Sequence, residues 1–146
     1  MTLILREAIL DDAEIIYQWR NNEATRKVSF HTEVIPYEKH LLWFKASLKN
    51  SNRLLFILLS EAQAVGSLRF DIFGEVAEVS VQIAPDQYGK GFGSEGLKKG
   101  SVVLRIKCPQ VKRINANILP DNEVSQKAFA KAGFLLSHYV YQLIQE

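Results

Sequence analysis

Apolar and polar positions follow different periods in different parts of the chain, and each period predicts an element. The first fifty residues fit a short strand over residues 2–8 and two amphipathic helices with apolar residues every three or four positions. Polar residues dominate the loop between these helices, residues 23–33, and Pro36 suits the first turn of the second helix. This part of the chain is therefore predicted as one strand followed by two helices.

The middle of the chain changes to strand patterns. Residues 54–59 are a continuous apolar run of strand length, whereas residues 64–73 and 76–84 alternate between apolar and polar side chains. Gly74 and Glu75 separate the two alternating runs and fit a two-residue hairpin turn, in which the glycine adopts a positive φ. The turn also fixes the register of the predicted hairpin.

The last third of the chain alternates between helical and extended patterns. It predicts a helix over residues 91–107, a strand over 112–119, a helix over 122–132 and a final extended segment over 134–144. The predicted order is β-α-α-β-β-β-α-β-α-β. This order favours a single α/β (α+β) domain, residues 1–146, with a mixed sheet and helices on its faces.

Composition narrows the classes of function. The chain is 47% hydrophobic and carries 18 Lys and Arg against 16 Asp and Glu, a net charge of +2, which is atypical of nucleic-acid binders. The single cysteine, Cys108, excludes an intramolecular disulfide and a cysteine-rich zinc site, and no metal is predicted. The longest apolar run is too short to cross a membrane, and the charged N-terminus does not resemble a signal peptide. We therefore expect a cytoplasmic protein with neither a membrane nor a nucleic-acid partner.

A glycine-rich segment between a predicted strand and a predicted helix carries the clearest chemical signal. Tyr88-Gly89-Lys90-Gly91-Phe92-Gly93-Ser94 places three alternating glycines where the backbone turns, so that several N–H groups and a helix N-terminus converge on one spot. This arrangement favours an anion site over a plain connection. A dinucleotide fingerprint is excluded, because Lys112 and Arg113 stand where an acidic ribose ligand is expected, and no Gly-Lys-Ser/Thr completes a P-loop.

The glycines belong to a longer pattern. Pro85-Asp86 before the loop, the three glycines, Asn122 and then Lys131-Ala132-Gly133-Phe134 resemble the acetyl-CoA-binding core of the GNAT N-acetyltransferases, and the resemblance covers nearly the whole chain. It implies a mixed, mostly antiparallel twisted sheet flanked by about four helices. It also implies that acetyl-CoA is the cosubstrate and that its acetyl group is transferred directly to a small-molecule primary amine.

The resemblance further implies which residues bind acetyl-CoA. The loop amides hold the pyrophosphate of CoA, the strand edge from Val81 to Ile83 pairs with the pantetheine arm, and Asn122 hydrogen-bonds the same arm or simply caps its helix. The residues of the loop are Tyr88, Gly89, Lys90, Gly91, Phe92, Gly93 and Ser94.

Two positions depart from the family's pattern. Tyr88 stands where the loop usually opens with Arg or Gln, and Phe129 stands where many relatives have the Tyr that protonates the leaving thiolate. Because Phe129 has no proton to donate, the acid is replaced by Tyr139, Tyr141 or solvent, or is not needed. A covalent route through Cys108 is disfavoured, because a helix C-terminus does not stabilise a thiolate. The missing tyrosine also leaves open a catalytically silent CoA-binding domain.

The hairpin register supplies candidates for the catalytic base. Pairing across the Gly74-Glu75 turn sets Asp71 opposite Glu78, and Arg69 opposite Ser80, on one polar face. Two carboxylates that lie close together push the pKa of one of them upward, which suits a base for an amine near neutral pH. The alternative is a solvated face with no catalytic role.

The two N-terminal helices and their loop carry the predicted acceptor site. Their pattern resembles acetyltransferases that act on UDP-linked 4-amino sugars in pseudaminic-type pathways, and ribosomal-protein N-terminal acetyltransferases share part of it. The residues concerned are Trp19, Arg20, Asn21, Arg26, His40 and Trp43. Cations pair with a diphosphate and aromatic rings stack on a base or sugar, so a nucleotide sugar fits. Core packing explains Trp19 equally well, and His40 also fits the edge of the core.

The end of the chain leads to the prediction of a homodimer. Only thirteen residues, 134–146, follow Gly133, whereas the relatives usually form two strands there. A second copy of the chain is expected to complete the sheet.

Overall fold

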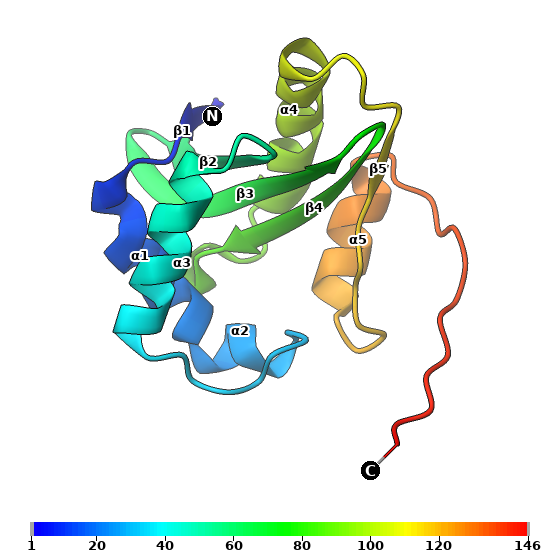
Figure 1. The fold of residues 1–146 in the computed structure, drawn as a ribbon, viewed down its shortest axis with the longest axis horizontal. Coiled ribbons are helices and arrows are strands. Elements are labelled where there is room, and N and C mark those ends of the chain that lie inside the picture. The colour runs from blue at the N-terminus through cyan, green and yellow to red at the C-terminus, as the bar shows by residue number, and fades with distance from the viewer. Residues whose placement is uncertain (1, 146) are drawn as a thin grey trace.

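The fold is a five-stranded sheet with helices on both faces, as a computed structural model that describes residues 2–145 shows (Figure 1). The strands lie in the sheet in sequence order: β1 (Leu3–Glu7), β2 (Arg53–Ser60), β3 (Gln63–Phe73), β4 (Val76–Ile83) and β5 (Arg113–Asn115). The helices are α1 (Ala13–Asn21), α2 (Glu23–Lys27), α3 (Tyr37–Lys49), α4 (Phe92–Lys107) and α5 (Glu123–Lys131). Strands β1 to β4 pair antiparallel and β5 pairs parallel with β4, which confirms the predicted mixed, mostly antiparallel sheet.

Two apolar cores lie on opposite faces of the sheet. Helices α1 and α3 cover one face, where Trp19 and Phe44 pack on Ile57, and α4 and α5 cover the other (Figure 1). Leu68 and Phe70 of β3 are fully buried beneath α4. Because side chains alternate along β3, its neighbouring polar residues face the side of α1 and α3.

Two glycines bring α4 close to the sheet. A Cβ atom on Gly96 would lie 2.9 Å from Cδ1 of Leu58, and a Cβ atom on Gly100 would overlap the side chain of Leu68. A larger residue at either position would require these leucine side chains to move. The approach fixes where the N-terminus of α4 lies relative to the end of β4.

The hairpin of β3 and β4 has the predicted turn and register. Gly74 has a φ of +66°, the left-handed region that the two-residue turn requires. Asp71 pairs with Glu78, and Arg69 pairs with Ser80. The prediction that these four side chains share one face of the sheet is confirmed.

Three elements differ from the sequence-based expectation. The predicted loop over residues 23–33 contains the short helix α2, which begins because the Asn22 side chain accepts a hydrogen bond from the N–H of Ala24 at 2.9 Å. The strand predicted over residues 112–119 is only three residues long, because β5 has a strand partner, β4, over just that length. The segment over 134–144 forms no strand, since no neighbouring strand pairs with it.

No helix within residues 2–145 is both long enough and apolar enough to span a lipid bilayer.

Candidate active site

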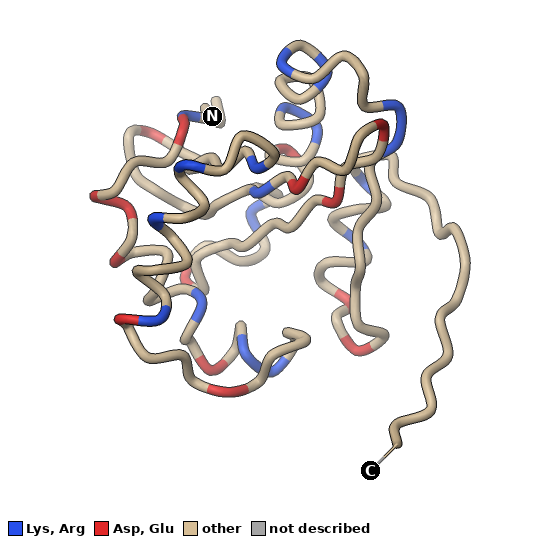
Figure 2. The backbone as a smooth tube through the Cα atoms, in the orientation of Figure 1, with Lys and Arg blue, Asp and Glu red and all other residues tan. Residues whose placement is uncertain are grey.

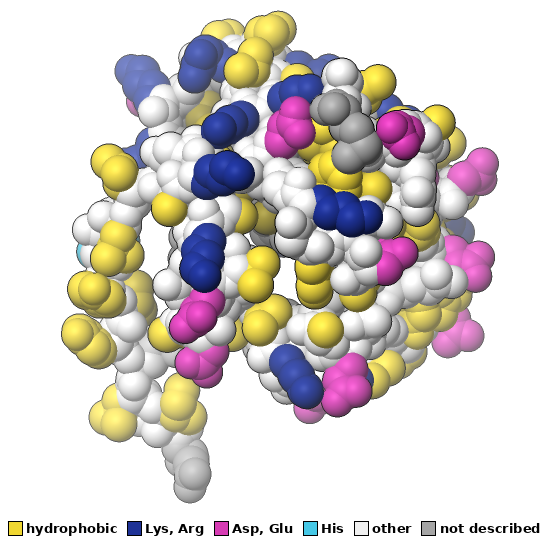
Figure 3. Space-filling view, turned by 180° about the vertical axis from the view of Figure 1, so that it is seen from behind, with side chains coloured by type: hydrophobic (Ala, Val, Ile, Leu, Met, Phe, Trp, Pro, Cys, Tyr) yellow, Lys and Arg dark blue, Asp and Glu magenta, His cyan; other side chains and the backbone are white. Residues whose placement is uncertain are grey.

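Strands β4 and β5 pair over three residues and then separate. Val76–Glu78 pairs with Arg113–Asn115, and within the described chain no pairing of β4 with β5 continues beyond Glu78. The edge of β4 from Val79 to Ile83 therefore has free backbone groups on the side away from β3. The space-filling view from behind shows a hollow between the part of the molecule formed by α5 and the body formed by the sheet and the other helices (Figure 3). An extended ligand arm has a strand edge to pair with at this place.

The glycine-rich loop begins where this free edge ends. Gly89 and Gly91 both have a φ of +80°, and a Cβ atom on either would meet nothing within 4 Å. Glycine is thus needed there for the backbone conformation and not for packing, and the loop surface is open. The first intrahelical bond of α4 runs from the N–H of Glu95 to the carbonyl of Gly91 at 3.2 Å. The N–H groups of residues 92–94 precede it and are free to bind an anion.

Side chains around the loop hold its shape. Phe92 and Ser94 are buried, and the Ser94 hydroxyl donates to the carbonyl of Gly91 at 3.1 Å. Lys90 donates to the Gln87 side chain at 3.0 Å, and Tyr88 is 43% exposed. These contacts leave the backbone amides as the groups that face a ligand, and their chemistry fits the pyrophosphate of CoA.

Helix α5 lies across the hollow from β4. The Asn122 side-chain oxygen accepts a hydrogen bond from the N–H of Ser125 at 3.1 Å, so Asn122 caps α5 in this structure. Phe129 is buried and packs edge-to-face on Phe134, with ring centroids 4.9 Å apart. Phe129 is therefore a core residue, and its position offers no proton donor.

The polar face of β3 and β4 carries one paired and one unpaired carboxylate. Asp71 is bound by Arg53, at 2.5 Å from Nε, and by Arg69, at 3.2 Å from Nε. Glu78 is exposed, and no residue in the described part of the chain forms an ion pair with it. It stands at the last paired position of β4 and β5, opposite Asn115. The two carboxylates are neighbours as predicted, and of the two only Asp71 has ion-pair partners among the described residues.

Three guanidinium groups surround the Trp43 ring on the same side of the sheet. Those of Arg20, Arg69 and Arg53 lie 4.9, 5.5 and 5.6 Å from the ring centroid. Burial lowers the pKa of Arg69, and the Arg53 guanidinium acts in the same direction, while Asp71 opposes the shift. Charged positions of both signs are otherwise spread over the molecule, with Lys and Arg frequent along α4 and the turn after it (Figure 2).

The other predicted acceptor residues hold the N-terminal helices and their loop together. Trp19 is 7% exposed and belongs to the core. Asn21 exchanges two hydrogen bonds of 3.0 Å with the backbone of Ile35, and Arg26 donates to the carbonyls of Asn21 and Thr32. Of the predicted set, the structure therefore brings Arg20 and Trp43 into the charged cluster and places His40 next to Trp43.

His40 is fully buried among aromatic rings. Its Nε2 lies 2.9 Å from the carbonyl of Ala13, and its ring centroid lies 5.8 Å from that of Trp43. Burial lowers the pKa of His40, and the nearby Arg20 adds to this shift, so the ring is neutral at physiological pH. Because His40 is fully buried, its ring offers no surface to an acceptor in this structure, and its predicted role toward the acceptor stays a prediction.

The predicted acid lies apart from this site. Tyr139 is 72% exposed and Tyr141 is 91% exposed, both within the segment that follows α5 and forms no strand. The sequence-based prediction also missed Arg53. It pairs with Asp71 only because a β-bulge at Leu58 and Leu59 sets the register of β2 and β3, and no local pattern in the sequence reveals that bulge.

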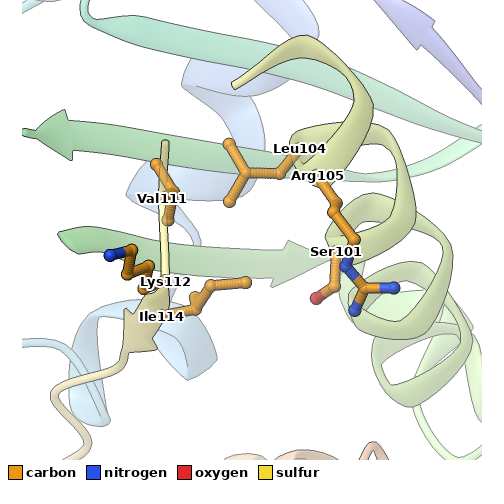
Figure 4. Close-up of a pocket in the computed structure, with 6 residues that line it drawn as sticks. All are labelled: Ser101, Leu104, Arg105, Val111, Lys112 and Ile114. Carbon is orange, nitrogen blue, oxygen red and sulfur yellow. The ribbon is translucent and has the colours of Figure 1, made fainter. Parts of the chain in front are cut away.

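A separate hollow lies between the C-terminal half of α4 and the start of β5 (Figure 4). Its volume is about 90 Å³. Its lining residues are Ser101, Leu104, Arg105, Val111, Lys112 and Ile114. Its Ser101 hydroxyl donates to the carbonyl of Leu97 at 2.7 Å. Among residues 2–145 no group of three His, Cys, Asp or Glu side chains is placed to hold a metal ion.

Known proteins resemble this chain over almost its whole length. The family of acetyltransferase (GNAT) domains matches residues 2–135. An uncharacterized N-acetyltransferase of Bacillus subtilis strain 168, YoaA, is 28% identical over 152 residues, which cover 96% of this chain and 85% of that protein. The structure of the aminoglycoside acetyltransferase AAC(6')-Ib in complex with coenzyme A aligns with a TM-score of 0.81 at 19% identity, covering 95% of this chain and 87% of that one. The structure of RimL, a ribosomal L7/L12 alpha-N-protein acetyltransferase in complex with coenzyme A, aligns with a TM-score of 0.81 at 16% identity, covering 94% and 82%.

The chain belongs to the family of GNAT acetyltransferase domains. The predictions that it has the GNAT fold and that it is an acetyl-CoA-dependent N-acetyltransferase are confirmed at the level of this family. None of the three relatives described above is named for a nucleotide sugar.

Replacing Gly91 by alanine is expected to weaken coenzyme A binding by about tenfold, equivalent to about 1.4 kcal/mol. Alanine disfavours a φ of +80° by roughly 1–2 kcal/mol, so the loop turns its N–H groups away from the pyrophosphate. The dissociation constant is measured by isothermal titration calorimetry. Gly74→Ala is the matched control, because it places the same strain in the distant hairpin turn and should leave this constant unchanged. Equal affinities in wild type and Gly91→Ala contradict the assignment of the loop.

Proposed function

We propose that this chain transfers the acetyl group of acetyl-CoA directly to the primary amine of a nucleotide-linked amino sugar. The observation that carries the catalytic part is the position of Glu78, an exposed carboxylate without an ion pair, at the point where β4 and β5 separate. A base belongs at this point, since an arm bound along the free edge of β4 ends near it.

Residues of the loop and of β4 bind the donor in this proposal. The amides around Gly89, Gly91 and Gly93 hold the pyrophosphate, and the edge from Val81 to Ile83 pairs with the pantetheine arm. A Cβ atom on Gly93, in the first turn of α4, would lie 3.5 Å from the side chain of Ala128 and 3.8 Å from that of Ile83, so the N-terminus of α4 lies close to both β4 and α5. Acetyl-CoA supplies the acetyl group as a thioester.

Glu78 accepts one proton of the acceptor's ammonium group, and the neutral amine nitrogen then bonds to the acetyl carbon as the C–S bond breaks. The nitrogen loses its second proton to solvent as the amide forms. Asp71 assists by pairing with Arg53 and Arg69, and the Arg69 guanidinium in turn lies near enough to Glu78 to act on it electrostatically. The leaving thiolate takes a proton from solvent or from Tyr139, because Phe129 has none to donate. Tyr139 serves only when the segment after α5 lies closer to β4 than it does here.

The Trp43 cluster supports the choice of acceptor. Guanidinium groups pair with a diphosphate, and an aromatic ring at the same place contacts a base or sugar. Arg20 and Trp43 combine the two features, with 4.9 Å between the guanidinium carbon and the ring centroid. A protein N-terminus is the second candidate acceptor, favoured by the similarity of the fold to that of RimL.

The proposal is tested by following the release of CoA thiol from acetyl-CoA with a panel of amines. The panel contains UDP-4-amino sugars, aminoglycosides, polyamines and ribosomal N-terminal peptides. We expect turnover with the UDP-4-amino sugar. Turnover with the ribosomal N-terminal peptides alone would identify a protein N-terminus as the acceptor instead of a nucleotide-linked amino sugar. Acetyl-CoA binding without release of thiol for any amine would contradict the proposal and point to a silent CoA-binding domain.

Glu78→Gln is expected to lower kcat by about 10²- to 10⁴-fold, because the amide accepts no proton from the ammonium group. The affinity for acetyl-CoA should not change. Steady-state rates at saturating substrate provide the measurement. Glu75→Gln is the matched control, because it removes an exposed carboxylate of the same hairpin that pairs with Lys112 at 2.9 Å. Unchanged turnover in Glu78→Gln would rule out this base.

A homodimer is the proposed assembly. Seven apolar side chains between residues 135 and 144 are each at least 70% exposed, and β5 is an edge strand. The residues are Leu135, Leu136, Tyr139, Val140, Tyr141, Leu143 and Ile144. Figure 3 shows such side chains along the segment that stands off from the body. Pairing of this segment with a second copy would bury them.

Multi-angle light scattering is expected to give twice the mass of the chain, 16.6 kDa per copy. Replacing Leu136 and Val140 together by serine should shift the mass toward the monomer, whereas Ile106→Ser, a control at an exposed apolar side chain of α4, should not. A monomeric wild-type protein would refute the dimer.

A further inference from the structure

Arg20 is a partly buried cation without a counter-charge. Its guanidinium lies over Trp43, and within residues 2–145 no carboxylate or other acceptor bonds to it. Burial lowers the pKa of Arg20, and the guanidinium of Arg69 adds to the shift. Buried or partly buried cations in proteins normally have an anionic partner, so the unpaired Arg20 guanidinium suggests a binding role.

The other arginines of this region differ from Arg20 in this respect. Arg53 is bound by Asp71 and by the Ser47 hydroxyl at 2.9 Å. Arg69 is bound by Asp71 and donates to the Ser80 hydroxyl at 3.3 Å. Arg26 is bonded to two backbone carbonyls. Of these four guanidinium groups only that of Arg20 has all its N–H donors free.

The cluster around Trp43 carries more positive than negative charge. Three guanidinium groups approach one ring, and a single carboxylate, Asp71, lies among them. Even with the exposed Glu78 counted, one positive charge is left over. Glu78 lies near enough to act on Arg69 electrostatically, so the excess charge and the proposed base share one face of the sheet.

We propose that Arg20, backed by Trp43 and Arg69, binds an anionic group of the acceptor, and that this enzyme therefore acetylates primary amines that carry a carboxylate or phosphate. A guanidinium group offers paired donors that match the two oxygens of either group. The choice of amine rests on the proposed function, whereas the anion site itself is tested without turnover.

This assignment changes the expected specificity. When the anionic group of an acceptor is held at Arg20 of α1, the amine of the same molecule is directed toward Glu78 of β4. A polycation such as an aminoglycoside meets an excess of positive charge at the same place and is repelled. The enzyme should thus reject the class of acceptor for which AAC(6')-Ib is named, although the two folds are alike.

Anion binding is measured by isothermal titration calorimetry on protein saturated with coenzyme A, so that the glycine-rich loop is already filled. The probes are inorganic pyrophosphate for the phosphate arm and succinate for the carboxylate arm. Arg20→Gln should weaken binding of the preferred probe by about 10- to 100-fold, the loss of a hydrogen-bonded charge pair. Binding of neither probe to the wild-type protein overturns the proposal.

Lys45→Gln is the matched control, because it removes one exposed positive charge from α3, two residues after Trp43, and should change the affinity less than twofold. Equal losses in the two variants would show a general charge effect and refute the site. Arg20→Gln should also melt at the same temperature as wild type or higher, since it removes an unpaired cation. A lower melting temperature together with unchanged anion binding would assign Arg20 to structure alone.

Turnover separates this inference from the proposed function. Two pairs of amines that differ by one anionic group serve here, ethanolamine with phosphoethanolamine and butylamine with 4-aminobutyrate. The anionic member of a pair should have the higher kcat/KM, and Arg20→Gln should remove that preference. Acetylation without such a preference refutes the anion site and keeps the acetyltransferase. Anion binding without acetylation of any of these amines or of the UDP-amino sugars, aminoglycosides, polyamines and peptides tested above refutes the proposed acetyltransferase function. It leaves the anion site at Arg20 supported.

Discussion

Strand β4 has a complete set of hydrogen bonds on one side and an incomplete set on the other, and the candidate active site depends on this asymmetry. Its pairing with β3 runs over eight positions from Val76 to Ile83, whereas its pairing with β5 stops after Glu78. Buried backbone groups require partners, so an edge left free inside the sheet is stable only when water or a ligand satisfies it. The short length of β5 therefore leaves the edge of β4 beyond Glu78 open to a ligand.

The packing of α4 places the glycine-rich loop at this edge. Gly96 and Gly100 let the helix lie close to Leu58 and Leu68, and the loop before the helix is short. Because the distance from the end of β4 to the start of α4 is small, the left-handed glycines are needed to turn the chain within it. The same residues that compact the core therefore aim the free N–H groups of Phe92, Gly93 and Ser94.

Local patterns predicted the parts of the site that lie close together in sequence. The Gly74-Glu75 turn fixed the hairpin register, so Asp71 and Glu78 were placed opposite each other correctly. The charged cluster around Trp43 was not predictable in this way. It joins α1, α3, β2 and β3, and Arg53 enters it through a bulge-dependent register. Long-range packing decides such contacts, and no periodicity in one chain reports it.

Arg20 and Asp12 show that a charge at a helix can serve either stability or function. Asp12 is buried next to α1 and is bound by Arg6 through two contacts of 2.8 Å and by the N–H of Ile9. Burial opposes ionisation of Asp12, but these bonds keep its pKa below the usual value, so the charge holds the fold together. Arg20, on the same helix, has lost part of its hydration and has gained only an aromatic ring. A cation–π contact is worth about 0.5–2 kcal/mol, less than a desolvated charge costs when it has no counter-ion. In the proposed complex a bound anion supplies the missing counter-charge, so Arg20 costs the free protein some stability and favours the binding of an anionic acceptor.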